Sequence, residues 1–171
     1  MRDELIDIMM KGKLVVVAGT GVSLQSLGGP THHPEAVVAG WSGLLESGVK
    51  YCEKYGLVKP KGAAIARLQI NEPDSPDDFI NAAQSIHNWM SSRTNARLHW
   101  IRDTIGKLTL IDPTLISAIQ SLGGLITTIN YDGLLHEVTK RPPVHWREQD
   151  KIDKYIRSGS LDWEHYAFLE K

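Results

Sequence analysis

The sequence is poor in cysteine, in net charge and in long apolar runs, and each shortage excludes a class of protein. Its only cysteine is Cys52, so neither an internal disulfide nor a zinc site built from several thiolates can form. The 19 basic and 20 acidic residues give a net charge of −1, which provides no excess of basic residues for binding nucleic acid. No apolar run approaches the roughly 20 residues that cross a bilayer. We expect a soluble protein that binds neither membranes nor nucleic acid directly.

Two further features bear on where the protein works. The N-terminal stretch "MRDELIDIMMKGK" carries acids where a signal peptide needs a basic flank and a long apolar centre, so we expect a cytoplasmic location. Cys52 has apolar neighbours at helical spacing. This setting favours a buried structural thiol over a catalytic one, which stays the weaker alternative.

The hydrophobic pattern predicts few strands and many helices. Two apolar, β-branched runs have strand length: "KLVVVAG" from residue 13 and "LITTIN" from residue 125. Their unbroken apolarity indicates strands covered on both faces, as in a parallel sheet. Residues 24–40 show no clear period and predict a loop. Helices are expected over residues 2–10, 41–56, 63–68, 76–90, 94–108, 113–122, 132–140 and 147–159.

Local signals mark the ends of several of these helices. Ser42 is expected to cap the helix that follows it, and Gly56 to end that helix. Ser75 before Pro76 is a second start signal, and Asp112 is a third. The order of elements predicts a helix-rich α/β fold, a Rossmann-like layered domain with a parallel sheet flanked by helices, over residues 1–171. Two strands are few for a finished sheet, so we expect further strands or a fold that continues beyond the C-terminus.

A glycine-rich turn, "GTGVS", follows the first strand. Gly19 and Gly21 permit positive φ and close approach of the backbone to a ligand, and the N–H groups of a helix beginning there would hold phosphate. Thr20 would line the site, and Ser23 would add a hydroxyl donor. The third glycine of a dinucleotide fingerprint is missing because residue 24 is Leu24. A tight turn with no ligand is the alternative.

Asn130 and Asp132, in "TTINYD", fall at the end of the second strand. Ligands of doubly wound sheets bind at the carboxyl ends of the strands, so we expect these two side chains to meet the turn at residues 19–23. A cleft with N–H donors on one side and an amide and a carboxylate on the other would suit a nucleotide. The alternatives are that Asp132 caps the next helix and that Asn130 stabilises the turn.

Three motifs in order, "VVVAGTGVS", "GWSGLL" and "LITTINYDGLL", resemble the sirtuin-like domains, especially their bacterial NAD-hydrolysing branch, over roughly residues 10–140. The resemblance implies that NAD is the substrate or ligand. It places Asn130 beside the ribose that bears nicotinamide, where it would help to position the attacking water, and Asp132 near the nicotinamide amide. The implied NAD-binding residues are Gly19, Thr20, Gly21, Val22, Ser23, Thr128, Asn130 and Asp132.

The resemblance also implies a biological setting. Members of this branch hydrolyse NAD to nicotinamide and ADP-ribose in antiviral or cell-suicide defence. We accordingly expect a homo-oligomer, with an activating protein partner as a further expectation. The zinc module of the sirtuin deacetylases needs several cysteines, so this chain is expected to hold no zinc and not to be a deacetylase of that kind.

The chain departs from the family at its catalytic histidine. The family carries a His-Gly pair on a strand beyond the Asn motif, and this sequence has no His-Gly pair. The expectation of an NADase therefore requires that strand beyond residue 171 or a substitute, for which His145 and His165 are weak candidates. The alternative is an NAD- or ADP-ribose-binding module that acts in oligomer or filament assembly. An unrelated α/β domain and a metal site at His32 and His33 are less favoured.

Overall fold

The computed structural model describes residues 2–29, 34–140, 144–145 and 147–158. The chain forms two compact units. The sheet unit comprises Met1–Gly29 and Thr109–Lys171, and the helical unit comprises Pro30–Leu108, so the second is inserted in the sequence of the first. The prediction of a single domain over residues 1–171 stays a prediction, because a domain can contain more than one compact unit.

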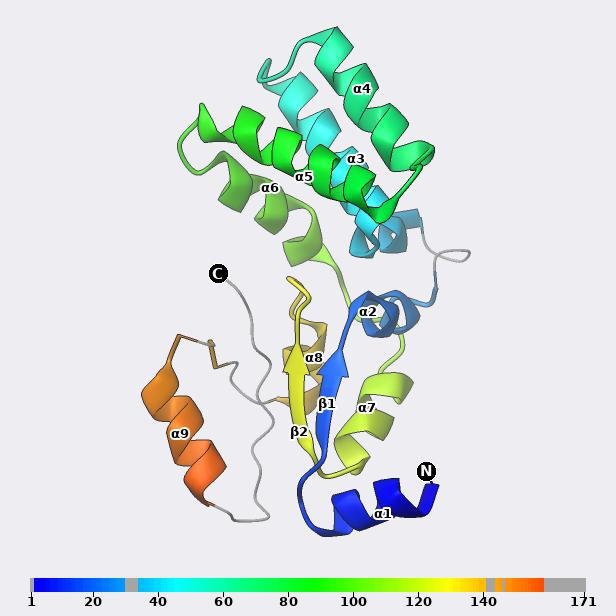
Figure 1. The fold of residues 1–171 in the computed structure, drawn as a ribbon, viewed down its shortest axis with the longest axis vertical. Coiled ribbons are helices and arrows are strands. Elements are labelled where there is room, and N and C mark those ends of the chain that lie inside the picture. Colours follow the sequence, from blue (N-terminus) through cyan, green and yellow to red (C-terminus); the bar gives the residue numbers. More distant parts are fainter. Residues whose placement is uncertain (1, 30–33, 141–143, 146, 159–171) are drawn as a thin grey trace. The chain divides into compact units, whose positions relative to one another are not determined.

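The sheet unit contains both described strands, which lie side by side and run in parallel (Figure 1). Val15 pairs with Leu125, and the register continues to Ala18 opposite Thr128. The carboxyl ends of the two strands therefore lie next to each other, although they are far apart in sequence. The elements of this unit are α1 (Arg2–Met10), β1 (Val15–Ala18), α2 (Thr20–Ser26), α7 (Thr114–Ser121), β2 (Leu125–Thr128), α8 (Leu134–Thr139) and α9 (Gln149–Ser158).

The two-stranded sheet is not buried on both faces. Ala18, Ile126 and Thr128 are buried, whereas Val15 and Val17 are 55% and 64% exposed. The expectation of strands covered on both faces is therefore wrong for the described residues. The expectation of an α/β chain rich in helix, with a parallel sheet, is confirmed.

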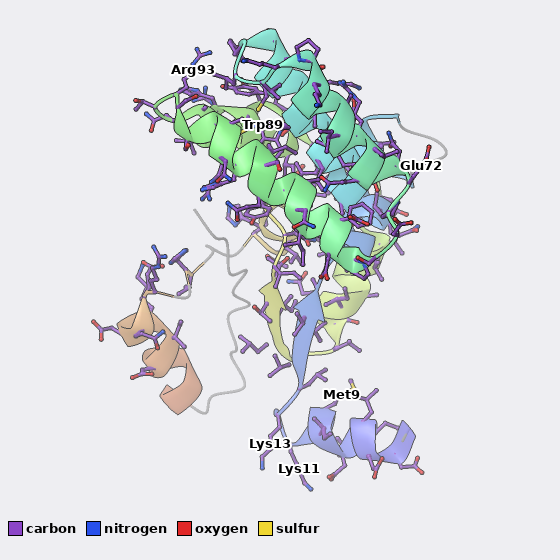
Figure 2. The ribbon with its side chains drawn as sticks, turned by 45° about the horizontal axis from the view of Figure 1, so that its top comes forward. Met9, Lys11, Lys13, Glu72, Trp89 and Arg93 are labelled. Carbon is purple, nitrogen blue, oxygen red and sulfur yellow. The ribbon has the colours of Figure 1, made fainter. Side chains whose placement is uncertain are left out.

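The helical unit has an apolar core of its own. Its elements are η1 (Pro34–Ala39), α3 (Trp41–Lys54), α4 (Pro60–Asn71), α5 (Pro76–Ser91), α6 (Ala96–Asp103) and η2 (Ile105–Lys107). Helices α3, α4 and α5 pack against one another. The buried core includes Val49, Ile86 and Trp100. Trp89, on α5 (Figure 2), packs against this core, whereas Trp41 is 59% exposed.

Several helix boundaries agree with their sequence signals. Helix α5 begins at Pro76, and the Asp78 carboxylate accepts a hydrogen bond from the Ser75 backbone N–H at 3.1 Å, which satisfies a donor that the first turn leaves free. Helix α3 ends before Gly56, which has φ +66°. The expected cap at Ser42 is wrong, because the helix already begins at Trp41 after Gly40.

Three other elements differ from their predictions. The expected loop at residues 24–40 is replaced in part by the end of α2 and by η1. Helix α4 extends beyond the short helix predicted at residues 63–68. The single helix expected at residues 94–108 is divided at Thr104 into α6 and η2.

Small residues on α3 let its neighbours approach closely. A Cβ atom added at Gly43 would lie 2.0 Å from the Val37 carbonyl oxygen, and one added at Gly48 would lie 3.0 Å from the Trp100 ring. The indole N–H of Trp100 donates to the Ser47 hydroxyl at 2.9 Å, so the ring is fixed at its polar end as well. Within the motif "GWSGLL", Gly43 allows this close approach and Leu44 and Leu45 are buried, so the motif has a packing role in this chain.

Cys52 is fully buried in the helical unit, and burial raises the pKa of its thiol from 9.0 to about 11. We expect the folded chain to resist a thiol reagent at pH 8 and the unfolded chain to react at once, because the thiolate is the nucleophile. Rapid labelling of the folded chain, measured by mass spectrometry, would contradict this expectation.

The same pKa shift gives a pH dependence with a definite sign. The unfolded thiol loses its proton above about pH 9, whereas the folded thiol keeps it to about pH 11. The unfolded state therefore binds fewer protons between these values, so this group lowers the free energy of unfolding as the pH rises through that range.

Candidate functional site

The turn after β1 is extended at Gly19 and helical from Thr20. Gly19 has φ −116° and ψ −170°, and neither Gly19 nor Gly21 is among the described glycines with positive φ. The positive φ that glycine permits is therefore not used at either position. A Cβ atom added at either position would meet no other atom of the described chain within 4 Å. Neither backbone conformation nor packing within the described residues explains why glycine stands there.

The strand ends are joined by Thr128. Its hydroxyl donates to the carbonyl oxygen of Ala18 at 3.1 Å and accepts a hydrogen bond from the backbone N–H of Asn130 at 3.0 Å. The Ile129 N–H also donates to the Ala18 carbonyl, at 3.3 Å. Thr128 is buried and fixes the backbone that leads into Asn130.

Ser23 connects the glycine turn to the second motif. Its hydroxyl donates to Oδ2 of Asp132 at 2.6 Å and accepts a hydrogen bond from Nδ2 of Asn130 at 2.7 Å. These partners lie 109 and 107 residues away in the sequence. The two segments expected to meet at the strand ends therefore do meet, through direct side-chain contacts.

Asp132 lies just before α8. Its Oδ1 accepts a hydrogen bond from the Leu134 N–H at 3.1 Å, so Asp132 contacts the first residue of this helix, whose N-cap position is Gly133. Both of its oxygens have donors, and the side chain is 8% exposed. Both donors are neutral groups, so hydrogen bonds, and not an ion pair, compensate the cost of burying the carboxylate.

The predicted site residues differ in what they still offer a ligand. The Val22 N–H donates to the Gly19 carbonyl at 2.9 Å and is used within the turn. Ser23 has a single hydroxyl hydrogen, which Asp132 accepts. Thr20 and Asn130 are partly exposed, and within the described chain Oδ1 of Asn130 has no hydrogen-bond partner. The accessible polar groups of the site are thus those of Thr20 and Asn130, beside two glycines.

Ser26, one turn beyond Ser23 on α2, was not among the predicted site residues. Ser26 is fully buried, and its hydroxyl has no hydrogen-bond partner among the described residues. Its carbonyl accepts hydrogen bonds from the N–H groups of Ile111 and Asp112, both at 2.9 Å. The three-residue spacing from Ser23 places both serines on one side of the helix, which was the available signal.

Among the described residues, no histidine takes part in the hydrogen-bond network around Ser23. His136 is exposed on α8, and the His145 N–H donates to Glu148 at 2.8 Å near α9. His32, His33 and His165, also considered above, lie outside the described residues. Among the residues that are described, no cluster of three or more His, Cys, Asp or Glu side chains could hold a metal ion.

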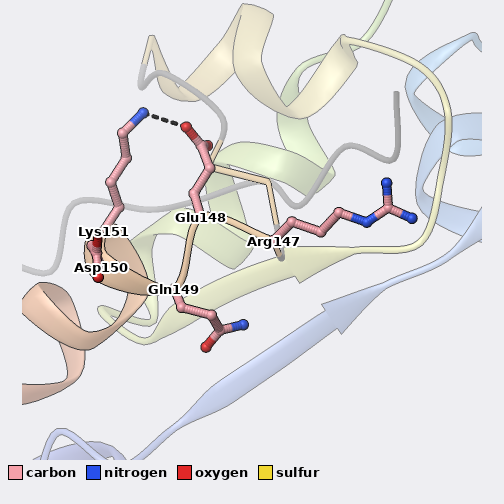
Figure 3. Close-up of a pocket in the computed structure, with 5 residues that line it drawn as sticks. All are labelled: Arg147, Glu148, Gln149, Asp150 and Lys151. Atoms are coloured by element: carbon pink, nitrogen blue, oxygen red, sulfur yellow. Dashed lines mark hydrogen bonds and ion pairs between the residues drawn. The ribbon is translucent and has the colours of Figure 1, made fainter.

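A separate hollow of about 330 Å³ lies at the start of α9 (Figure 3). Five consecutive residues line it, from Arg147 to Lys151. The Lys151 ammonium contacts the Glu148 carboxylate at 2.5 Å and lowers the pKa of that carboxyl group. None of the predicted NAD-binding residues lines this hollow.

Comparisons with family models, with curated proteins and with solved structures found no match to this chain. In the part of the chain that the structure describes, no helix combines the length and the apolar character needed to cross a bilayer.

Proposed function

We propose that the sheet unit binds NAD at the carboxyl ends of β1 and β2 and hydrolyses it to nicotinamide and ADP-ribose. The observation that carries the proposal is the contact of Ser23 with both Asn130 and Asp132. It brings a polar, uncharged amide beside a glycine turn at the strand ends, which is where α/β sheets bind nucleotides.

The open space beside the two glycines supports a ligand that places a bulky, charged group there, such as the diphosphate of NAD. Because a Cβ atom at Gly19 or Gly21 would meet nothing in the described chain, glycine there leaves room for a group outside the chain. In the proposed complex, residues 19–23 approach the diphosphate of NAD with their backbone. Thr20 contributes its hydroxyl, and Thr128 keeps the two strand ends together.

The chemistry of the bond explains why an amide suits this position. Nicotinamide leaves the ribose as a neutral molecule, so its departure requires no proton donor. The ribose carbon develops positive charge as its bond to the nicotinamide nitrogen breaks. Water then forms the new C–O bond and releases its proton to the solvent. In this proposal Asn130 accepts a hydrogen bond from that water and orients it without adding a charge.

The remaining parts of the proposal rest on the sequence. The order of elements supports a Rossmann-like arrangement around the sheet, and the N-terminal stretch supports a cytoplasmic location. The family resemblance supports a homo-oligomer with an activating protein partner and a role in defence through NAD depletion. The exposed face at Val15 and Val17 supports further layers, since parallel sheets are normally covered on both faces.

A second candidate function is supported by one observation. The described hydrogen-bond network around Ser23 includes no histidine, and the family uses a histidine for catalysis. A domain of this kind would bind NAD or ADP-ribose without cleaving it and would act in oligomer or filament assembly.

One experiment distinguishes the two candidates. The purified chain is mixed with NAD, binding is followed by calorimetry, and free nicotinamide is measured by chromatography. Binding with release of nicotinamide supports the hydrolase, and binding without release supports the assembly module. If the chain shows neither, both proposals are wrong.

A Gly21→Ala variant is expected to separate ligand binding from stability. Alanine within α2 favours the helix by about 0.5–1 kcal/mol, and the open space around Gly21 accepts the methyl group. The same methyl group would crowd the ligand at a cost of about 1–3 kcal/mol, which weakens NAD binding roughly 5- to 150-fold. Thermal unfolding and calorimetry measure the two effects.

The matched control is Gln25→Ala, an exposed position on the same helix, which is expected to leave NAD binding unchanged. Full NAD affinity in the Gly21→Ala variant would contradict the placement of the ligand.

A further inference from the structure

We infer that Ser23 and Asp132 are positioning residues, which fix the amide of Asn130 so that its oxygen faces away from the network as a free acceptor. The orientation follows from the hydrogen bonds alone. Its use in NAD cleavage rests on the function proposed above.

The hydrogen bond between Ser23 and Asp132 can run in only one direction. A carboxylate accepts hydrogen bonds and donates none. Asp132 already accepts from the Leu134 N–H through Oδ1. The contact of 2.6 Å at Oδ2 therefore uses the single hydroxyl hydrogen of Ser23.

The direction of this hydrogen bond also fixes the orientation of the Asn130 side-chain amide. Because the hydroxyl hydrogen of Ser23 is committed to Asp132, its oxygen can only accept at the 2.7 Å contact with Asn130. Asn130 must then present its NH₂ group to Ser23. An amide oxygen and nitrogen have nearly the same shape, so the charge on Asp132 selects between the two orientations.

The polar atom of the Asn130 side chain that can still bind a ligand is Oδ1. The backbone N–H of Asn130 is held by the Thr128 hydroxyl at 3.0 Å, and Nδ2 is held by Ser23. With both ends of the residue fixed, Oδ1 points away from Ser23 and has no partner within the described chain. A fixed acceptor of this kind orients the hydrogen of a water molecule or of a sugar hydroxyl, and a freely rotating amide would not.

The inference predicts what happens when Asp132 is replaced by asparagine. In the Asp132→Asn variant, Oδ1 at residue 132 still accepts from Leu134, and the new NH₂ group donates to Ser23. The Ser23 hydroxyl is then free to donate to Asn130, whose amide reverses. The side-chain amide that is protected by Ser23 moves from residue 130 to residue 132, with little change in shape.

Side-chain amide exchange with solvent, measured by NMR on the ¹⁵N-labelled full chain, tests this prediction without NAD. The Asn130 NH₂ group is expected to exchange about tenfold more slowly than exposed asparagine side chains. In the Asp132→Asn variant that protection is expected at residue 132 and lost at Asn130. In Ser23→Ala, which serves if Asp132→Asn fails to fold, Asn130 is expected to lose its protection. Signals are assigned from their loss in Asn130→Ala.

Several results would overturn the inference: an unprotected Asn130 in the unmodified chain, or protection that persists at Asn130 in Asp132→Asn or in Ser23→Ala. Failure of the proposed function is separate. If the exchange pattern is as expected but the chain does not bind NAD, the orientation stands and the NAD proposal fails. If NAD is cleaved, Asp132→Asn is expected to lower kcat at least about tenfold with KM nearly unchanged; an unchanged kcat would refute the role of the orientation in cleavage.

Discussion

An Asn130→Ala variant is expected to release nicotinamide from NAD roughly 10²- to 10³-fold more slowly than the unmodified chain, a loss of the size seen when a single fixed polar group is removed from an active site. Asn130 is the residue at the strand ends whose amide is held in place by Ser23 while its oxygen stays available. Alanine removes that oxygen. Nicotinamide release under saturating NAD measures the effect on turnover, and calorimetry measures binding.

The substitution should leave the fold intact. It removes one hydrogen bond to Ser23, with a cost of about 1 kcal/mol in the free energy of unfolding. Asn81→Ala, at an exposed asparagine of α5, is the control and should release nicotinamide at the unmodified rate. Equal rates in Asn130→Ala and Asn81→Ala would show that Asn130 takes no part in the reaction.

The second large effect is expected at Gly43, where alanine should lower the free energy of unfolding of the helical unit by about 3 kcal/mol. A Cβ atom there would lie 2.0 Å from the carbonyl oxygen and 2.5 Å from the carbonyl carbon of Val37. These are backbone atoms and cannot rotate away, so η1 or the start of α3 must shift. Urea unfolding followed by circular dichroism gives the change.

Gly40 provides a matched control against the same carbonyl. A Cβ atom at Gly40 would lie 3.4 Å from the Val37 oxygen, which is an ordinary contact, so Gly40→Ala is expected to cost no more than about 1 kcal/mol. Similar losses in the two variants would mean that crowding against Val37 is not what requires glycine at position 43.

The sequence was sufficient to predict the strands and the meeting of the two motifs. Apolar, β-branched runs marked β1 and β2, and the carboxyl ends of parallel neighbours must lie together. That rule alone placed Ser23 near Asn130 and Asp132. The hydrogen bonds among them could not be predicted, because side-chain orientation depends on the register and on the start of α2.

Other features depend on contacts between distant residues and left no signal in the local pattern. The exposure of Val15 and Val17 could not be read from a run that is apolar throughout. The role of Gly43 depends on the approach of Val37. Periodicity reports which residues prefer the interior and does not report what covers them.

The insertion of the helical unit between the strands has a consequence for synthesis on the ribosome. Ala18 and Thr128, which become neighbours, are 110 residues apart, and at translation rates of about 5–20 residues per second β1 waits roughly 5–20 s for its partner. Helices α3, α4 and α5 contact one another within the inserted segment, and contacts between elements that are close in sequence form early. A nascent chain therefore carries a formed helical unit and an unpaired, β-branched segment at the same time, and it is during this interval that aggregation or chaperone binding at β1 is most favoured.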